Sequence, residues 1–395
     1  MGCSVYFYSG AYDQDLKREL NADQLFSIYH EKRLVVDTIM YKREHPEWTA
    51  KIMLDSGAFT LYQKYKKNNE VLPEEVLQQY VDDYIDFLNE WGDDLFCFVA
   101  VDSVPDPTNV DQSFAQKTWD NYLYMYSKLK ESVRDKLIPV FHYGEDFKWL
   151  RNMLEYRHED GSPVDYIGLA ISLEGTRKVR ITWGQECMKI IERSSNPNVK
   201  THAFGVGVKS VLDNINVTST DATSWVKRAA YGMISIDDKT IYVSDIHKKK
   251  LCGNHYGERS MAFQEEVEKI IKDRGFRFDP EIVPFTLEDN TARFTLESGD
   301  VIAVRDGDKL TVKTSEKTQD YDVVDYNGTI IGEWKNDDRS VVTFQEDGTV
   351  IYDNGRCLAT DPYARARFNI LDTQNWMKPI EKKVVTGYAI KKSLF

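Results

Sequence analysis

The stretch Leu54-Asp55-Ser56-Gly57-Ala58-Phe59 ends an apolar run with a carboxylate, a hydroxyl and a glycine. Three further apolar runs end in a similar way, at Phe98-Val99-Ala100-Val101-Asp102-Ser103, Tyr166-Ile167-Gly168-Leu169-Ala170 and Phe204-Gly205-Val206-Gly207-Val208. Each apolar run is typical of a buried strand, so the polar or glycine residues fall at its carboxyl end. A β/α barrel keeps its chemistry at that end of its strands, and the pattern therefore predicts such a barrel with a site at its mouth.

Strand-like and helix-like segments alternate over the first part of the chain. The predicted strands are Val5–Tyr8, Ile52–Leu54, Leu95–Val101, Leu137–Phe141, Tyr166–Ala170, Thr201–Phe204 and Ile215–Val217, with an eighth somewhere in Met233–Val243. Amphipathic patterns between them predict helices at Pro73–Trp91, Gln116–Leu129 and Phe147–Tyr156. This alternation favours an α/β fold, a TIM-type (β/α)8 barrel, and an open doubly wound sheet is the alternative.

The pattern changes near Phe278-Asp279-Pro280. Short alternating strands follow, among them Thr329–Trp334, Val341–Phe344 and Thr349–Tyr352, with hairpin signals at Asp306-Gly307, Asn327-Gly328, Asp347-Gly348 and Asn354-Gly355. We therefore predict two domains, a barrel over residues 1–278 and a small antiparallel β domain with a tail over residues 279–395. The tail from Arg365 onward has no assigned structure.

Composition narrows the function classes. The 395 residues carry a net charge of -13, so any polynucleotide must bind through a local basic patch rather than overall basicity. Five cysteines without regular spacing argue against a disulfide framework and for a reducing cytoplasm. No apolar run is long enough to span a bilayer, and neither a secretion signal nor a cofactor motif is recognised.

Basic residues form three groups after predicted strand ends. Lys64, Lys66 and Lys67 alternate with tyrosines, Lys227 and Arg228 follow Asp221, and residues 248–250 are all lysine. Lysine with interleaved tyrosine suits phosphate contact and base stacking, which predicts nucleic-acid binding. The alternative for each group is a solvated helix face.

Together the strand-end motifs resemble those of tRNA-guanine transglycosylases (queuine tRNA-ribosyltransferases) and their DNA-modifying relatives, which replace guanine in a polynucleotide by a 7-deazaguanine. The resemblance implies that Asp55 is the general acid and base, with Ser56 and Gly57 beside the bound base. Ala58 and Thr60 depart from the family's Asp-Ser-Gly-Gly-Phe-Gln motif. Without the resemblance, Asp55 reads equally as a cap of the following helix.

The resemblance assigns base recognition to the next two strand ends. Asp102 corresponds to an aspartate that recognises guanine, and a carboxylate suits this role because it accepts from both N1–H and the 2-amino group. His142 stands where the family has a glutamine that contacts the base. The alternatives are a loop aspartate and a structural histidine.

Two glycine-containing segments complete the implied base site. Gly168, Leu169 and Ala170 match the family's Gly-Leu-Ala, whose backbone binds the base, and Glu174 corresponds to a glutamate that helps to select the 7-substituent. Phe204 and Gly205 match the family's Met-Gly-Val-Gly, so that Phe204 stacks on the base. Gly205 and Gly207 admit another interpretation, a cradle for the phosphate of a small ligand.

Asp221 is the implied nucleophile, and Asp213 is the competing candidate. Base exchange with retention requires two displacements through a covalent glycosyl-carboxylate intermediate. The family's zinc motif is missing, since Cys252, His255 and His247 lack its spacing, and we predict no metal site.

The missing zinc motif favours DNA over tRNA as the polymer. The expected partners are DNA, or alternatively tRNA, a free 7-deazaguanine such as the 7-cyano or 7-aminomethyl form, and a second copy or an accessory protein. Relatives that act on DNA are associated with phages and bacterial modification islands. The alternative from another class is a catalytically inactive barrel that binds nucleic acid or a protein partner.

Overall fold

The structure is a computed structural model, and its described residues are 3–103, 113–171, 175–244, 255–284, 286–288, 291–296, 299–306, 309–313, 318–322, 330–335, 341–345 and 349–377. The chain packs as two compact units, Met1–Thr223 with Thr373–Phe395, and Ser224–Asp372. This division by packing falls after Thr223, whereas the change in sequence pattern falls after residue 278. The antiparallel strands of the second unit's two larger sheets begin just after that change, at Glu281.

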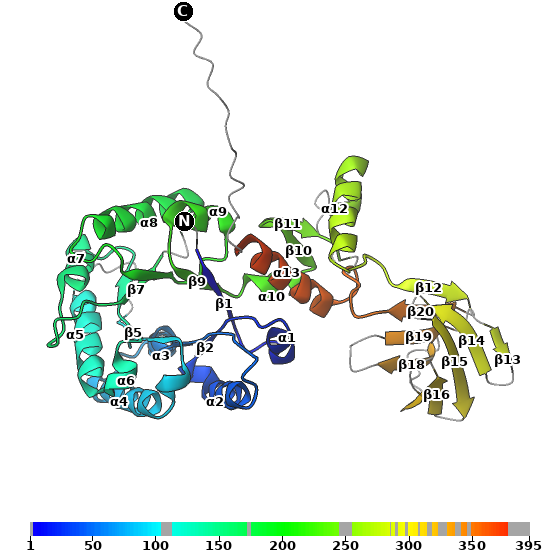
Figure 1. Cartoon of the computed structure of the whole chain (residues 1–395), viewed down its shortest axis with the longest axis horizontal. Coiled ribbons are helices and arrows are strands. Elements are labelled where there is room, and N and C mark those ends of the chain that lie inside the picture. The colour runs from blue at the N-terminus through cyan, green and yellow to red at the C-terminus, as the bar shows by residue number, and fades with distance from the viewer. Residues whose placement is uncertain are drawn as a thin grey trace, which may run out of the picture. The chain divides into compact units, whose positions relative to one another are not determined.

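A nearly closed parallel sheet of nine strands forms the centre of the first unit (Figure 1). Its order is β5-β4-β3-β2-β1-β9-β8-β7-β6. The strands are β1 (Val5–Ser9), β2 (Gln24–Ser27), β3 (Ile52–Asp55), β4 (Cys97–Val99), β5 (Leu137–Ile138), β6 (Val140–His142), β7 (Tyr166–Ala170), β8 (Lys200–Ala203) and β9 (Ser219–Ala222). The two ends of this order, β5 and β6, are consecutive in the chain and are separated only by Pro139, so the sheet curves round on itself.

The α/β class and the barrel-like parallel sheet confirm the fold prediction in outline. The sheet has nine strands rather than eight because the predicted strand Leu137–Phe141 is divided at Pro139, which has no N–H to donate to a ladder. The carbonyl of Pro139 still accepts from the Gly168 N–H at 2.8 Å, so the chain stays in place beside β7.

Helices lie outside the strands of this unit (Figure 1). They are α1 (Gln14–Glu19), α2 (Ile28–Glu44), α3 (Ala58–Lys67), α4 (Glu74–Trp91), α5 (Ser113–Lys128), α6 (Glu131–Arg134), α7 (Phe147–Glu155), α8 (Arg177–Glu192) and α9 (Lys209–Ile215), with a 3-10 turn at Gly92–Asp94. Their apolar faces pack against outward-pointing strand residues such as Phe26, Ile52 and Leu54. The predicted helices therefore have the expected amphipathic role.

The inward-pointing side chains of the strands form a second, smaller core. It includes Phe7, Leu25, Met53 and Val99, from four neighbouring strands. Because side chains alternate along a strand, the residues two positions further on also face the barrel interior. These are polar on several strands, and they provide the site described below.

Three strand assignments differ from the sequence prediction. The predicted strand Ile215–Val217 is wrong, since Ile215 ends α9 and the ninth strand is Ser219–Ala222. The predicted eighth barrel strand in Met233–Val243 is also wrong, because β10 (Met233–Ile236) and β11 (Lys239–Tyr242) form an antiparallel pair in the second unit. The prediction missed β2, whose four residues include only two apolar ones.

The second unit contains α10 (Ser224–Ala230), the β10–β11 pair, a 3-10 turn at Tyr256–Glu258, α12 (Met261–Asp273) and two larger antiparallel sheets. One sheet has the order β12-β20-β19-β18 and the other β13-β14-β15-β16-β17. The strands are β12 (Glu281–Pro284), β13 (Thr286–Glu288), β14 (Thr291–Leu296), β15 (Gly299–Asp306), β16 (Lys309–Lys313), β17 (Thr318–Asp322), β18 (Ile330–Lys335), β19 (Val341–Gln345) and β20 (Thr349–Asp353). The predicted antiparallel character of this region is confirmed.

One hairpin signal can be checked directly. Gly355 has a positive φ of 71°, but the turn at Asn354-Gly355 leads from β20 (Thr349–Asp353) to a helix rather than to a pairing strand, so the hairpin prediction there is wrong. At least one residue of each other predicted turn pair lies outside the described residues. The unassigned tail begins within a helix, α13 (Pro362–Met377). None of the helices in the described ranges has the length and hydropathy that a membrane crossing requires.

Candidate active site

Polar side chains from separate strands meet at the carboxyl end of the barrel-like sheet. Ser9, Ser27, Asp55, His142 and Asp221 lie at or next to the ends of β1, β2, β3, β6 and β9. Each continues the inward-facing series of its own strand, so tertiary closure of the sheet brings together residues that are far apart in sequence.

Asp55 lies at the turn from β3 into α3. Its Oδ2 accepts from the Gly57 N–H at 3.0 Å, which fixes the carboxylate in the turn. Gly57 is itself the N-cap of α3 and has no side chain to cap it, so the capping alternative is wrong. Gly57 has a φ of 69°, and a Cβ at that position would lie 2.5 Å from the Tyr29 Cβ, so the turn requires glycine. The hydrogen bond from Gly57 thus holds the Asp55 carboxylate in the turn between β3 and α3.

The surroundings of Asp55 also change its acidity. Burial, followed by the negative charges of Asp102 and Asp221, raises its pKa from 3.8 to about 7, although the Gly57 N–H opposes the change. A carboxyl group with this pKa can give or take a proton near neutral pH. The charges of Asp102 and Asp221 thus act on Asp55 from the ends of other strands of the same sheet.

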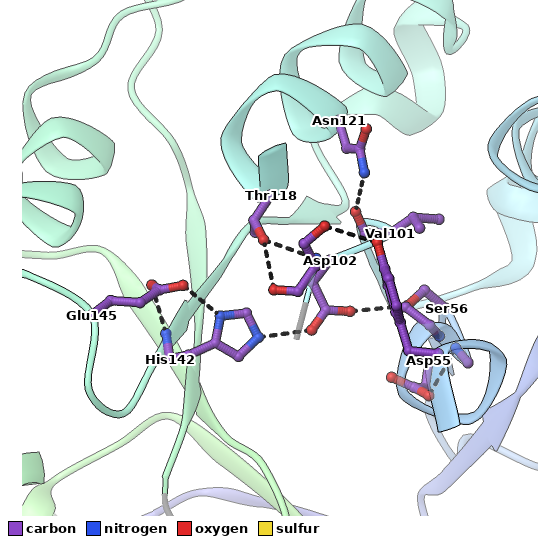
Figure 2. A network of polar contacts seen from close by, with 12 residues as sticks. Asp55, Ser56, Val101, Asp102, Thr118, Asn121, His142 and Glu145 are labelled. Atoms are coloured by element: carbon purple, nitrogen blue, oxygen red, sulfur yellow. Dashed lines mark hydrogen bonds and ion pairs between the residues drawn. The ribbon is translucent and has the colours of Figure 1, made fainter. Parts of the chain in front are cut away.

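Asp102, His142 and Glu145 form a hydrogen-bonded row (Figure 2). His142 Nε2 lies 2.8 Å from Asp102 Oδ2, and its Nδ1 lies 2.9 Å from Glu145 Oε1. The second carboxylate oxygen of Glu145 accepts from the His142 backbone N–H at 3.0 Å. His142 is 5% exposed and Glu145 8%, so this row is shielded from water.

The two carboxylates set the charge of His142. Burial favours the neutral ring, but the hydrogen bonds and charges of Asp102 and Glu145 outweigh it and raise the His142 pKa from 6.5 to about 9. The imidazolium then donates from both ring nitrogens, one to each carboxylate. Direct contact between His142 and a base stays a prediction, and it would require one of these two bonds to open.

The segment that carries Asp102 is fixed from two sides (Figure 2). Ser56 Oγ donates to Asp102 Oδ1 at 3.4 Å, and Asn121 Nδ2 donates to the Val101 carbonyl at 3.0 Å. Thr118 accepts from the Ser103 N–H at 2.9 Å and donates to its carbonyl at 3.3 Å. Ser56, predicted beside the base, therefore also orients Asp102.

Asp221 receives three hydrogen bonds at the end of β9. Its Oδ1 accepts from the Gly205 N–H at 2.8 Å and lies 3.3 Å from His202 Nε2, and its Oδ2 accepts from Ser9 Oγ at 2.7 Å. Burial alone would raise its pKa, but the His202 and Gly205 contacts and the Ser9 hydroxyl lower it below 3.8. Asp221 is therefore a carboxylate near neutral pH. The competing Asp213 lies on α9 and pairs with Lys209 at 2.9 Å.

The glycine-containing segments are placed beside this carboxylate. A Cβ on Gly168 would lie 2.5 Å from the Phe204 ring, so glycine lets that ring lie over β7. The Phe204 ring also contacts the His202 ring edge-on, with centroids 4.5 Å apart. Leu169 is buried toward the helices, which leaves only its backbone, with the last residue of β7, Ala170, facing the site. Glu174 lies outside the described residues.

The predicted basic groups differ in position. Lys64, Lys66 and Lys67 are exposed on α3, in the connection from the carboxyl end of β3 to α4. Lys227 is exposed on α10, whereas Arg228 contacts Ser235 and Asp238 within the second unit. Residues 248–250 lie outside the described residues.

No group of three metal-ligating side chains occurs within the described ranges. His255 is buried, and its Nδ1 accepts from the Gly257 N–H at 3.0 Å, which removes one potential ligand atom. Cys252 and His247 lie outside the described residues. Nothing in the described donor set therefore fits a tetrahedral metal ion.

Sequence reasoning missed Ser9, Glu145 and His202. Glu145 follows His142 by three residues in a tight turn, and Ser9 continues the alternation of Val5 and Phe7. Both signals were available once the strand faces were assigned. His202 gave no such signal, because its partner Asp221 lies on a strand that the sequence did not predict.

No protein-family model matches the chain, and a comparison with curated proteins finds no match. The description of the site therefore rests on its geometry.

Proposed function

We propose that this chain is a base-exchange transglycosylase that replaces guanine in DNA by a 7-deazaguanine through a covalent glycosyl-Asp221 intermediate. One observation carries the proposal. Two aspartates at the same end of the sheet, Asp55 partly buried and Asp221 buried, have opposite acidities: the pKa of Asp55 is about 7, and that of Asp221 lies below its ordinary value of 3.8. Paired carboxyl groups of opposite acidity are the arrangement that a retaining displacement at a sugar carbon requires.

The chemical roles follow from the two environments. The Asp221 carboxylate attacks the anomeric carbon, the bond between sugar and guanine breaks, and its electron pair leaves with the base. Protonated Asp55 gives its proton to the departing guanine, and the resulting carboxylate then takes a proton from the incoming base. That base attacks the anomeric carbon, and the Asp221 carboxylate is released.

Asp102 supports recognition of a guanine-like base. Each of its oxygens accepts one hydrogen bond within the protein, from Ser56 or from His142, so each retains a lone pair. Two acceptors side by side match N1–H and the 2-amino group, a pair of donors that adenine and cytosine do not offer in this arrangement. The His142 ring, held between Asp102 and Glu145, fixes the orientation of the Asp102 carboxylate.

The charge of the site argues against the phosphate-ligand alternative. The Gly205 N–H, which would have to bind the phosphate, already donates to Asp221. Asp55, Asp102 and Asp221 would repel a phosphate group at the same place. Phosphates of a polynucleotide would instead lie outside, where Lys64, Lys66 and Lys67 are exposed.

The choice of DNA over tRNA rests on the sequence, which lacks the zinc motif of the tRNA enzymes. A duplex substrate would have to flip the target nucleotide out of the stack to bring its anomeric carbon to Asp221. Mismatched or single-stranded guanine should therefore react faster than paired guanine.

The test is guanine exchange with the full-length protein. Purified protein is mixed with labelled guanine and, separately, with duplex DNA, single-stranded DNA and tRNA, and label in each polymer is counted. Asp221→Asn and Asp55→Asn are the site variants. Asp213→Asn is the matched control, because it removes an equally charged aspartate from the nearby surface helix α9.

We expect label to enter DNA with the wild type and with Asp213→Asn, and to be lost with both site variants. Denaturing electrophoresis should also show a protein–DNA adduct that depends on Asp221. Label entering tRNA alone would replace the DNA assignment by the tRNA one. Absence of exchange in every polymer, with undiminished binding of DNA by the Asp221 variant, would instead support the inactive binding barrel.

A further inference from the structure

A row of polar side chains lies in the barrel interior beneath Asp221. Tyr166 on β7 contacts Ser219 on β9, Ser219 Oγ lies 2.6 Å from Nδ1 of His202 on β8, and His202 Nε2 lies 3.3 Å from Asp221 Oδ1. Ser219 and His202 have no exposed surface, and Tyr166 is 4% exposed. Polar groups at this depth are retained only at a cost in desolvation, which points to a role beyond filling space.

The hydrogen bonds of this row run in one direction. Burial raises the pKa of Tyr166, so its hydroxyl keeps its proton and can donate to Ser219 Oγ, which leaves the Ser219 proton for His202. Ser219 can then donate to His202 Nδ1, which leaves the N–H of His202 on Nε2. The row therefore ends with an N–H donated to the carboxylate of Asp221.

Neighbouring strands show what an ordinary packing residue would be in this layer. The inward-facing side chains on β1, β2, β3 and β4 include Phe7, Leu25, Met53 and Val99, which are apolar. His202 lies against the Phe7 ring at a centroid distance of 6.0 Å and against Phe204 at 4.5 Å. A histidine in such apolar surroundings is explained by its two hydrogen-bond partners rather than by its shape.

The same atoms do not form a serine nucleophile. Ser219 lies beneath His202 with no exposed surface, and the carboxylate is the member nearest the mouth. A substrate that enters from the carboxyl ends of the strands would therefore reach Asp221 first. The order of the three groups is the reverse of the one that a serine hydrolase needs.

We propose that His202, fixed by Ser219 and Tyr166, is a positioning residue that orients Asp221 for attack through its Oδ2 atom. The inference rests on the proposed function, in which Asp221 is the nucleophile. Oδ1 accepts two hydrogen bonds, from Gly205 and His202, whereas Oδ2 accepts one, from Ser9. Oδ2 is therefore the oxygen with the more open lone pair.

The bond changes are consistent with this assignment. Oδ2 forms the bond to the anomeric carbon as the bond to guanine breaks, and Oδ1 becomes the carbonyl oxygen of the ester. The N–H groups of Gly205 and His202 remain on Oδ1 throughout. When the incoming base displaces the ester, these donors stabilise the negative charge that returns to the carboxylate, which makes it a better leaving group.

Few side chains that can ionise act on Asp221 besides His202. Among the described residues, Asp55 lies across the site and responds to the charge of Asp221, while Ser9 and Gly205 contribute neutral donors. Removing the His202 donor should therefore make the Asp221 carboxylate less stable relative to its protonated form.

The experiment compares His202→Leu, which removes both ring nitrogens, with His202→Gln, whose amide keeps one donor. Ser219→Ala removes only the far end of the row. His158→Leu is the matched control, since His158 is also buried but contacts Tyr122 away from the site. The first readout is the Asp221 pKa, which is measured by carbon-13 NMR titration of protein with labelled aspartates. The Asp221 signal is assigned by its absence from the spectrum of Asp221→Asn.

We expect the Asp221 pKa to rise by about 1 to 2 pH units in His202→Leu, and to recover in part in His202→Gln. Ser219→Ala should give a smaller rise, and His158→Leu none. In the exchange assay, the rate of adduct formation should fall about 10- to 100-fold with His202→Leu, with its acid limb moved to higher pH and KM for the polymer unchanged.

An unchanged Asp221 pKa in both His202→Leu and Ser219→Ala overturns the inference. Thermal unfolding of each variant shows which of them keep the fold. If His202→Leu does not fold, the pKa measured in Ser219→Ala decides the test. Failure of the proposed function is distinguishable, because the wild type would then lack exchange activity while the NMR titration still reports whether His202 acts on Asp221.

Discussion

One residue type has two acidities in this site, and the difference comes from hydrogen-bond donors. Among the described residues, Asp55 accepts one hydrogen bond, from the Gly57 backbone N–H, and two other carboxylates act on it through their charge, so burial dominates and its pKa rises. Asp221 is also buried but accepts three hydrogen bonds, so its pKa falls. The direction of each pKa shift therefore depends on the surroundings of the aspartate and not on the residue type.

The first prediction concerns Asp55→Asn and stability. Asp55 has a folded-state pKa of about 7 against an ordinary value of 3.8, so its contribution to stability is complete at low pH and is lost as pH rises through 7. Asparagine cannot ionise and should escape this loss. Between about pH 5 and about pH 8 we expect the wild type to lose about 1 to 3 kcal/mol relative to the variant.

Urea unfolding of both proteins at the two pH values measures this difference. Asp15→Asn is a suitable control, because Asp15 is exposed in the first turn of α1. Parallel losses in the wild type and Asp55→Asn would contradict the raised pKa.

The second prediction concerns Glu145→Gln and the charge of His142. Glutamine keeps one acceptor oxygen, where Glu145 uses one for the backbone N–H and one for the ring N–H, and it removes one of the two negative charges. The His142 pKa should therefore fall from about 9 by about 1 pH unit. A raised histidine pKa contributes stability below 6.5 that is lost as pH rises through 9, so the variant should lose it at lower pH. Imidazole NMR titration measures the pKa, with Glu155→Gln, exposed on α7, as the control. An unchanged titration would show that Asp102 alone sets this charge.

The turn from β3 into α3 shows how an element places a side chain. Gly57 has a positive φ, and a Cβ at this position would crowd the Cβ of Tyr29, the Ser27 hydroxyl and the Tyr80 hydroxyl. The turn brings Ser56 under Asp102 and returns the Gly57 N–H to Asp55. A single glycine therefore sets the geometry of two site aspartates.

The third prediction compares Gly57→Ala with Gly161→Ala. Gly161 also has a positive φ, 81°, but a Cβ there would meet nothing within 4 Å. Its substitution should cost about 1 kcal/mol from backbone strain alone. Gly57→Ala adds a contact of 2.5 Å with a neighbouring side chain, so it should cost at least about 2 kcal/mol more and reduce exchange activity.

Denaturant unfolding of the two variants under one condition gives the comparison. Equal destabilisation would mean that Tyr29 moves aside easily and that only the φ of Gly57 matters.

At the scale of the whole molecule, the proposed function requires a binding surface for an anionic polymer on an acidic chain. The chain carries a net charge of -13 and its site contains three aspartates, yet three exposed lysines lie together on α3 at the carboxyl end of the sheet. An anionic polymer should therefore bind through this lysine group and insert only a base into the acidic site.

The fourth prediction follows from this arrangement. Replacing Lys64, Lys66 and Lys67 by glutamine should weaken DNA binding and lower the slope of log affinity against log salt by about 2 to 3. The same change at Lys128, Lys130 and Lys189, exposed on other helices or loops, alters the net charge equally and should leave that slope nearly unchanged. Fluorescence anisotropy over a range of salt concentrations measures both. Equal slopes for the two triple variants would remove α3 from the binding surface.

The elements that sequence could predict are those with a strong periodicity. Strands built from apolar runs, such as Tyr166–Ala170, and amphipathic helices, such as Glu74–Trp91, agree with prediction within about a turn, since burial on one or both faces imposes a readable pattern. β9 escaped prediction because its inward-facing residues are Ser219 and Asp221, which belong to the polar interior rather than the apolar core. The strand that carries Asp221 was thus missed because its inward-facing residues are polar.

By itself the sequence determined that the chain alternates strands and helices, that polar residues follow several strands, and that an antiparallel region comes after them, because these are local patterns. Only the tertiary structure decided that Asp221 belongs to β9, that His202 lies beneath it, and that His142 lies between Asp102 and Glu145. Hydrogen bonds between distant strands depend on register and on closure of the sheet, and no local pattern encodes either one. The acidity of each aspartate depends in turn on those partners, so the chemistry of the site emerges only after folding.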